Sequence, residues 1–223
     1  MNKILRINRK INPFKKIINV EGDKSLSIRW ALLSSQSSKK CKSSNLLLSD
    51  DVINTLNCLK KLGVKIKFNN NFCEIDGLGL NGFNYKKNLV LDAGNSGTLG
   101  RLISGLLVHS EKNIIVKGDN SLSKRDFYRV TEPLKKFGAK FKTNHGKLPL
   151  KVKGTNNPVP IFYNENKGSA QCKSAVMFAA LNTFGETVIK AKKSRNHTEI
   201  LFKYLKLPIK VLKKKNYDII RIR

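Results

Sequence analysis

AGNSGTLGR, residues 93–101, follows the apolar stretch NLVL and combines glycines with Asn, Ser, Thr and Arg. The stretch fits neither the GxGxxG pattern nor the GxxxxGK(S/T) loop of nucleotide-binding proteins. Two other turns resemble it, GDKSLSIR (22–29) and KGSAQCKSA (167–175), and in each Gly and Ser precede a run with helical character. The serines of the three turns, Ser25, Ser96 and Ser169, are separated by 71 and 73 residues. The sequence therefore indicates one unit that is repeated three times.

A second marker follows each turn. INTLNCLKKLGVKIK (53–67) matches YRVTEPLKKFGAKFK (128–142), and TEILFKYLKLPIKVL (198–212) is a weaker third copy. Gly63 and Gly138 stand 75 residues apart, at points where a helix is expected to stop, because Gly readily adopts the left-handed C-cap conformation. In the third copy this place falls at or near Lys206, and Pro208 helps to end the helix.

Each unit is expected to contain two helices and several short strands. The first helices are predicted at 25–37, 97–109 and 169–182, and the second helices at about 50–62, 125–137 and 196–206. A strand is predicted between them, at 45–48, 113–118 and 186–191. Two closing strands end each unit, at 64–68 with 72–77, 139–143 with 148–154, and 209–212 with 217–223.

With the strand that leads into each first helix, the order of elements in the unit is βαβαββ. The three units are predicted at about residues 13–80, 81–155 and 156–223. Units of about 70 residues are too long for a solenoid repeat, so packing around a pseudo-threefold axis is expected. The predicted fold class is α/β, with residues 13–223 forming one domain of three repeats.

The composition is that of a folded protein, since 40% of the 223 residues are hydrophobic and 26% are charged. No apolar run approaches the about 20 residues that span a bilayer, and the basic N-terminus lacks the apolar core of a secretory signal. A soluble, cytoplasmic protein is therefore expected. The four cysteines form no CxxC pair and none has a His at ligand spacing, which predicts reduced, packed thiols and no metal site.

The formal net charge of +29 is open to two interpretations. One is a polyanionic partner or small anionic substrates. The other is a compositional bias toward Lys, Asn and Ile, since most lysines are dispersed along amphipathic segments. A basic module that binds nucleic acid stays as a competing but less favoured hypothesis, because aromatic residues are only 8% of the chain and form no nucleic-acid motif with Lys and Arg.

If the units pack symmetrically, three helix N-termini converge at one end of the domain. Free N–H groups and the helix dipole make such an end suited to anions. The side chains there fit this chemistry: Lys24, Ser25, Arg29, Asn95, Ser96, Thr98, Arg101, Ser169, Gln171 and Lys173. Gly97 permits close approach to the backbone, and cations precede the second helices at Lys124, Arg125 and Arg195, with His197 beside them. Taken singly, each of these residues is an ordinary helix cap or surface charge. Because the same pairing of a cap with a cation occurs in all three units, the sequence favours an anion-binding site.

Five segments resemble the enolpyruvyl transferase family in order and spacing: GDKSLSIR, AGNSGT..R, GDNSLSKR....V.EPLKKFGA, SAQ.KSA...A.LN..GET and SRNHTE. They fit the branch that acts on shikimate 3-phosphate better than the branch that acts on a nucleotide sugar, whose Lys-Asn start and catalytic Cys loop are not evident. The resemblance implies half of a two-domain fold. It also implies transfer of the enolpyruvyl group of phosphoenolpyruvate to the 5-hydroxyl of shikimate 3-phosphate, releasing phosphate in chorismate and aromatic amino acid biosynthesis, without a metal or organic cofactor.

Carried over position by position, the resemblance assigns shikimate 3-phosphate to Lys24, Ser25, Arg29, Ser169, Ala170, Gln171 and Arg195. It assigns phosphoenolpyruvate to Lys24, Asn95, Gly97, Arg125 and Gln171. Lys24 is therefore the expected active-site ligand for both substrates. Three positions depart from the family pattern: Ile28 replaces a His, Asn196 replaces an Asp, and Thr-Met is missing before Arg101.

The family enzyme has two similar domains with the active site between them, and this sequence resembles the N-terminal half. The resemblance places residues 1–12 as a strand of the other domain. The general base and several Arg and Lys ligands of phosphoenolpyruvate would lie in that domain too. We therefore expect this chain alone to bind substrate without turnover unless a second chain supplies the other half, with an inactive remnant as the alternative.

Overall fold

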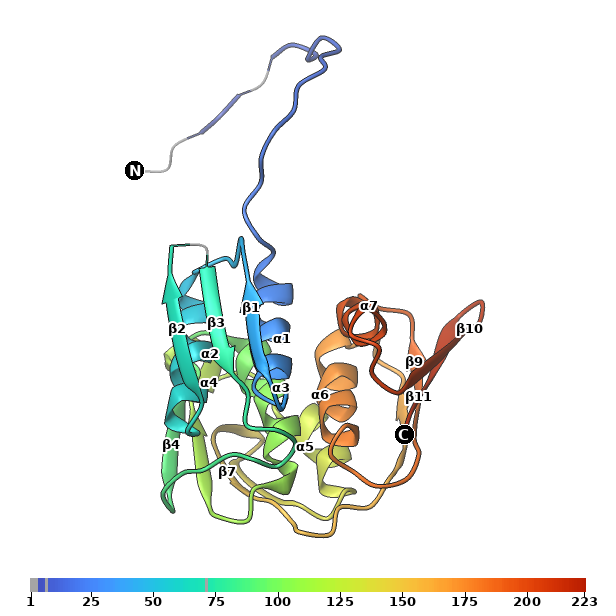
Figure 1. The fold of residues 1–223 in the computed structure, drawn as a ribbon. Coiled ribbons are helices and arrows are strands. Elements are labelled where there is room, and N and C mark those ends of the chain that lie inside the picture. The colour runs from blue at the N-terminus through green and yellow to red at the C-terminus, as the bar shows by residue number, and fades with distance from the viewer. Residues whose placement is uncertain (1–3, 7, 71) are drawn as a thin grey trace.

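The described part of the chain folds, after an extended N-terminal segment, into three small sheets with helices packed between them (Figure 1). The structure is a computed structural model that describes residues 4–6, 8–70 and 72–223. The first helix of each unit lies at the centre: α1 (Lys24–Ser34), α3 (Gly97–Leu106) and α6 (Ala170–Ala180). Every residue of α3 is buried, because α3 packs against α1 and α6. The predicted α/β class is confirmed.

The second and third units have the same strand order. In the second unit, β4 (Leu89–Asp92) runs parallel to β5 (Ile114–Lys117), and β7 (Lys147–Lys153) and β6 (Lys140–Asn144) follow antiparallel. In the third unit, the equivalent strands in the same order are β8 (Phe162–Glu165), β9 (Thr187–Lys192), β11 (Tyr217–Ile222) and β10 (Ile209–Lys213). These two sheets confirm the repeat that the sequence predicts.

The first unit has a sheet of three strands, in the order β1 (Lys40–Ser43), β3 (Phe72–Asp76), β2 (Lys65–Asn69). The prediction of a strand at 45–48 is wrong, because Asn45 adopts a left-handed turn (φ 57°) and the polar segment ahead of it forms β1. The described residues ahead of α1 form no lead-in strand and run away from the domain (Figure 1).

The segment 1–12, predicted as a strand of another domain, is described only at 4–6 and 8–12, and these residues form no strand here. Residues 1–3 and 7 lie outside the described part of the chain. The assignment of this segment to a second domain therefore stays a prediction.

Each first helix begins with a side chain that caps its N-terminus. Asp23, Ser96 and Ser169 accept hydrogen bonds from the backbone N–H three residues later, at 2.7, 3.2 and 3.3 Å. Such a cap contributes about 1 kcal/mol to helix stability. The prediction that Ser25 is the equivalent of Ser96 and Ser169 is wrong by two residues, since Ser25 lies inside α1 and Asp23 is the cap. With Asp23, the three caps are each 73 residues apart.

The second helices are α2 (Asp50–Lys61), α5 (Tyr128–Lys135) and α7 (His197–Tyr204). A short α4 (Asn120–Ser123) precedes α5, and a 3₁₀ turn (Leu107–His109) follows α3. Positive φ angles follow the second helices at Gly63 (94°), Gly138 (103°) and Lys206 (55°), as predicted from their spacing.

Apolar side chains from all three units form one core. Phe178 of α6 and Phe202 of α7 meet edge to face at 5.9 Å between ring centroids, which joins the two helices of the third unit. Cys58, Cys73 and Cys172 are buried free thiols, and burial raises the pKa of Cys58 to about 12. Among the residues described, no helix is both long and apolar enough to cross a membrane.

Candidate anion-binding site

The N-termini of α1, α3 and α6 open onto one cavity of about 440 Å³. Its lining gathers every residue assigned to a substrate by resemblance except Ser169: Lys24, Ser25, Arg29, Asn95, Gly97, Arg125, Ala170, Gln171 and Arg195. Asp51, Thr98 and His197 complete the lining. Residues that lie far apart in the chain thus meet at the end of the domain where the three helix dipoles are positive.

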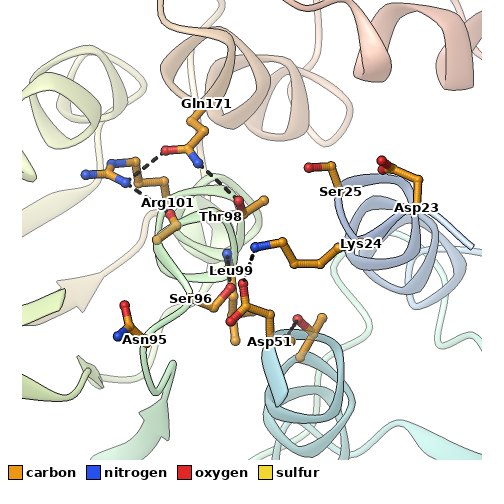
Figure 2. Close-up of polar contacts among 12 residues, drawn as sticks. Asp23, Lys24, Ser25, Asp51, Asn95, Ser96, Thr98, Leu99, Arg101 and Gln171 are labelled. Atoms are coloured by element: carbon orange, nitrogen blue, oxygen red, sulfur yellow. Dashed lines mark hydrogen bonds and ion pairs between the residues drawn. The ribbon is translucent and has the colours of Figure 1, made fainter. Parts of the chain in front are cut away.

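Lys24, in the first turn of α1, points toward Asp51 of the neighbouring helix (Figure 2). Its Nζ lies 2.8 Å from Oδ2 of Asp51, in the first turn of α2. Asp51 was not predicted as a site residue, because an acidic residue in a first helical turn ordinarily serves only the helix dipole. The lysine side chain is 48% exposed, so this ion pair is weak and an incoming anion can compete for the ammonium group.

Arg29 lies deeper and is only 3% exposed. Its three guanidinium nitrogens donate to neutral oxygens: Nε to Thr198 Oγ1 (2.7 Å), Nη1 to the Ser25 carbonyl (3.0 Å) and Nη2 to Ser174 Oγ (3.3 Å). Burial lowers the pKa of Arg29 to about 10, so the side chain keeps its charge at neutral pH. A buried cation without a carboxylate in contact is unfavourable by itself and is well suited to an anionic ligand.

Gln171 at the start of α6 is held by two neighbours from α3 (Figure 2). Arg101 Nη1 donates to Gln171 Oε1 at 2.8 Å, and Gln171 Nε2 donates to Thr98 Oγ1 at 3.0 Å. Arg101 also donates to the Asp126 carbonyl and lies 5.0 Å from the ring centroid of Phe127. Arg101 itself does not line the cavity; it contributes by holding the Oε1 atom of Gln171, which does line it.

The second unit contributes a closely packed edge of the cavity. Arg125 Nη2 donates to Asn95 Oδ1 at 3.1 Å, and both side chains are otherwise exposed. A Cβ atom on Gly97 would lie 2.8 Å from Arg101 Nη1 and 3.2 Å from Arg125 Nη1. The absence of a side chain at Gly97 therefore lets two guanidinium groups lie against the first turn of α3.

Besides Arg101, four residues of the predicted anion end do not line the cavity. Ser96 and Ser169 use their hydroxyls as helix caps and do not line the cavity. Lys124 is exposed outside the lining. The prediction that Lys173 faces an anion is wrong, because its side chain is buried against Glu199. The sequence motif places Lys173 one turn into the helix, but it does not show in which direction the lysine side chain points.

The residues that line the cavity are mostly hydrogen-bond donors. Lys24, Arg29, Arg125 and Arg195 supply cations, and Asp51 is the one carboxylate among the described lining residues. A hard cation such as Mg²⁺ or Ca²⁺ requires several oxygen ligands, whereas phosphate and carboxylate groups accept from donors of this kind. Within the described ranges, no cluster of three or more His, Cys, Asp or Glu side chains could hold a metal ion.

Known proteins resemble this chain in both sequence and fold. The family model for EPSP synthase (3-phosphoshikimate 1-carboxyvinyltransferase) matches residues 8–222. The 3-phosphoshikimate 1-carboxyvinyltransferase of Streptococcus agalactiae serotype Ia is 44% identical over 191 residues, which are 84% of this chain and 44% of that protein. The protein of the same name from Ruthia magnifica is 44% identical over 206 residues, covering 92% and 47%.

A solved structure of EPSP synthase from Acinetobacter baumannii superposes with a TM-score of 0.84 at 31% identity. The match covers 92% of this chain and 46% of that one. The chain thus spans about half the length of the curated relatives it matches. Since the family match extends over nearly the whole sequence, the chain belongs to the EPSP synthase (3-phosphoshikimate 1-carboxyvinyltransferase) family.

Proposed function

We propose that this chain forms the shikimate 3-phosphate side of an EPSP synthase active site and part of its phosphoenolpyruvate side. The reaction is transfer of the enolpyruvyl group to the 5-hydroxyl of shikimate 3-phosphate, with release of phosphate. The observation that carries the proposal is Arg29, a buried cation with neutral hydrogen-bond partners at a cavity where three helix N-termini meet. Both substrates are small polyanions, which such a cavity attracts and orients.

The first and third units bind shikimate 3-phosphate in this proposal. Lys24, Ser25 and Arg29 approach it from α1, and Ala170, Gln171 and Arg195 approach it from the third unit. Ser169 is assigned to the same substrate by resemblance, and its hydroxyl can accept from the Cys172 N–H and still donate its own proton to an anion. The free backbone N–H groups of the first turn of α6 are a further set of donors at that end of the helix.

The second unit binds phosphoenolpyruvate together with Lys24 and Gln171. Asn95 and Arg125 already contact each other at the cavity edge, and Gly97 leaves the helix N-terminus open beside them. Lys24 would exchange Asp51 for the anion. Because these donors are oriented before the substrate arrives, they can stabilise the charge of the transition state at little reorganisation cost.

The general base and the remaining phosphoenolpyruvate ligands come from a second domain in this proposal. Asp51, the one carboxylate among the described cavity residues, already pairs with Lys24. The chain by itself therefore binds shikimate 3-phosphate and turns over only when a domain of the same family faces the cavity.

Isothermal titration of shikimate 3-phosphate tests the proposal. We expect binding to the wild-type chain and about tenfold weaker binding to Lys24→Ala, since a charge-assisted contact contributes about 1.5–3 kcal/mol. Lys142→Ala, which removes the same charge from the exposed face of β6, is the matched control and should bind as wild type. No binding to the wild-type chain, or equal binding to all three proteins, would overturn the assignment.

A further inference from the structure

A polar cluster is buried behind Arg29 where α1, α6 and α7 meet. Lys173 of α6 and Glu199 of α7 form an ion pair with 2.5 Å between Nζ and Oε1, and their side chains are 1% and 5% exposed. Their sequence neighbours, Ser174 and Thr198, hydrogen-bond to each other at 2.6 Å. Both hydroxyls also accept from the Arg29 guanidinium. The ion pair therefore lies beside the hydrogen bonds of Arg29, and the two are joined through the backbone at Lys173–Ser174 and Thr198–Glu199.

The buried positive and negative charges of this polar cluster are unequal in number. Two buried cations, Arg29 and Lys173, share one buried carboxylate, and Glu199 contacts Lys173. Glu199 still lies close enough to raise the pKa of Arg29 against the larger lowering by burial. The unbalanced positive charge thus resides on Arg29, the cation that lines the cavity.

Without Lys173, Glu199 would be left without a cation in a buried position. Leaving one partner of a buried pair uncompensated is strongly unfavourable, so the carboxylate would turn to the nearest available cation. Arg29 is such a cation, because its Nε bonds to Thr198, the residue before Glu199, and the charge of Glu199 already acts on it. An ion pair between Arg29 and Glu199 would neutralise the guanidinium charge that the cavity offers to an anion.

We propose that Lys173 is a positioning residue that keeps Glu199 away from Arg29, so that the guanidinium stays available to an anion. The identity of that anion, shikimate 3-phosphate, rests on the proposed function. Glu199 in turn neutralises Lys173, and the pair holds α6 against α7 so that Ser174 and Thr198 keep their places beside Arg29. Lys173 thus serves the site indirectly, although its sequence motif suggested direct contact with the ligand.

Three variants separate this role from a purely structural one: Lys173→Met, Glu199→Gln and the double variant. Each is titrated with shikimate 3-phosphate and with inorganic phosphate. The Arg29 Nε–H resonance is followed by ¹⁵N NMR without any ligand. Backbone amide spectra and thermal unfolding report whether α1, α6 and α7 remain folded.

Lys173→Met should weaken anion binding at least tenfold and shift the Arg29 Nε–H resonance even without ligand, because Glu199 then contacts the guanidinium. The double variant should regain binding to within about threefold of wild type, together with the wild-type resonance, since neutral replacements remove both the carboxylate and the need for its partner. Glu199→Gln alone should bind at least as tightly as wild type. The double variant leaves neither charge of the pair unpaired, so it keeps the test open if a single variant does not fold.

Wild-type affinity in Lys173→Met would overturn the proposal. So would weak binding in the double variant, or loss of binding in folded Glu199→Gln, because either result would show that the pair acts only by holding the helices. A wild-type chain that binds no shikimate 3-phosphate would instead refute the proposed function. The Arg29 resonance and the phosphate titration would still decide the role of Lys173.

Discussion

Arg29 at the cavity and Lys40 on the first sheet are both cations of the first unit, yet they have opposite surroundings. Arg29 is 3% exposed and donates to neutral oxygens. Lys40 has a side chain 48% exposed, and it pairs with Glu74 at 2.7 Å and with Asp76 at 3.6 Å. An exposed pair contributes about 0–1 kcal/mol, whereas a buried cation without a counter-ion costs stability and reserves its charge for a ligand.

The solvent faces of two sheets differ in the same way. On β2 and β3 of the first unit, Lys65 stands opposite Asp76 and Lys67 stands opposite Glu74. On β6 and β7 of the second unit, Lys140 stands opposite Lys153 and Lys142 stands opposite Lys151. Both pairs of strands are antiparallel, although the β6–β7 pairing has a register shift between Lys142 and Asn144. The repeat therefore conserves the paired strands while the charges on their surface vary.

The largest expected effect is at Arg29. Arg29→Met should weaken shikimate 3-phosphate binding by about 100-fold, since truncating one partner of a desolvated charge pair costs about 2–5 kcal/mol. The free energy of unfolding should change little, because removal of an unpaired buried charge offsets the loss of its hydrogen bonds to Ser25, Ser174 and Thr198. Ser174 and Thr198 stay bonded to each other. Calorimetric titration and urea unfolding measure the two quantities.

Lys40→Met is the control for that comparison and should leave the affinity unchanged, because Lys40 lies on the sheet face. An equal loss of affinity in both variants would mean that net charge, and not the buried position of Arg29, governs binding.

A smaller effect is expected at Arg101, the second buried arginine. Arg101→Leu should weaken shikimate 3-phosphate binding about fivefold to tenfold, because Gln171 loses the donor that orients its amide. Titration checks the loss, and Arg101→Lys should recover part of it by donating to Gln171 Oε1. Unchanged affinity in Arg101→Leu would show that Thr98 alone holds Gln171.

On the first sheet, we expect a small dependence of stability on pH. The hydrogen bond from Lys40 holds the pKa of Glu74 below its ordinary value of 4.5. The stabilisation is therefore complete above pH 4.5 and is lost as the pH falls through the lowered folded-state pKa. Urea unfolding from pH 7 down to pH 2.5 should show wild type losing slightly more stability than Glu74→Gln. Parallel pH profiles of the two proteins would contradict this contribution.

The smallest expected effect is on the second sheet. Lys151→Glu places a carboxylate opposite Lys142, as in the first sheet, and should stabilise the protein by about 0.2–1 kcal/mol. Lys147→Glu makes the same change in net charge opposite Asn144 and is the matched control. Urea unfolding at low and high salt measures the gain, which should shrink as salt screens it. An equal gain in both variants would assign it to reduced net charge.

Most helices could be predicted from the sequence because the signals for them are local. Apolar periodicity, Gly63 and Gly138 at the helix ends, and the 71- and 73-residue spacings of the turns located six helices. The strand at 40–43 was missed because its side chains are largely polar and exposed, and the leucines after it suggested a strand that the turn at Asn45 prevents.

The site could be predicted in composition but not in its internal contacts. The residues from the three turns do meet at one cavity, as their matched positions suggested. Asp51 was missed as the partner of Lys24, and Lys173 was placed in the site instead of behind it. Both errors concern the direction of a side chain that leaves a helix, which depends on the neighbouring helix.

The sequence by itself determined the helices that begin at the cavity and the cationic chemistry of their turns, because these depend on residues within a few positions of each other. It also determined the repeat, because the same local pattern recurs at spacings of 71 and 73 residues. Only the tertiary structure decided which cation is free and which is neutralised. Arg29 meets Thr198 across 169 positions, and Lys173 is drawn to Glu199 only because α6 packs beside α7. The charge left for a ligand is therefore a property of helix packing and not of any single motif.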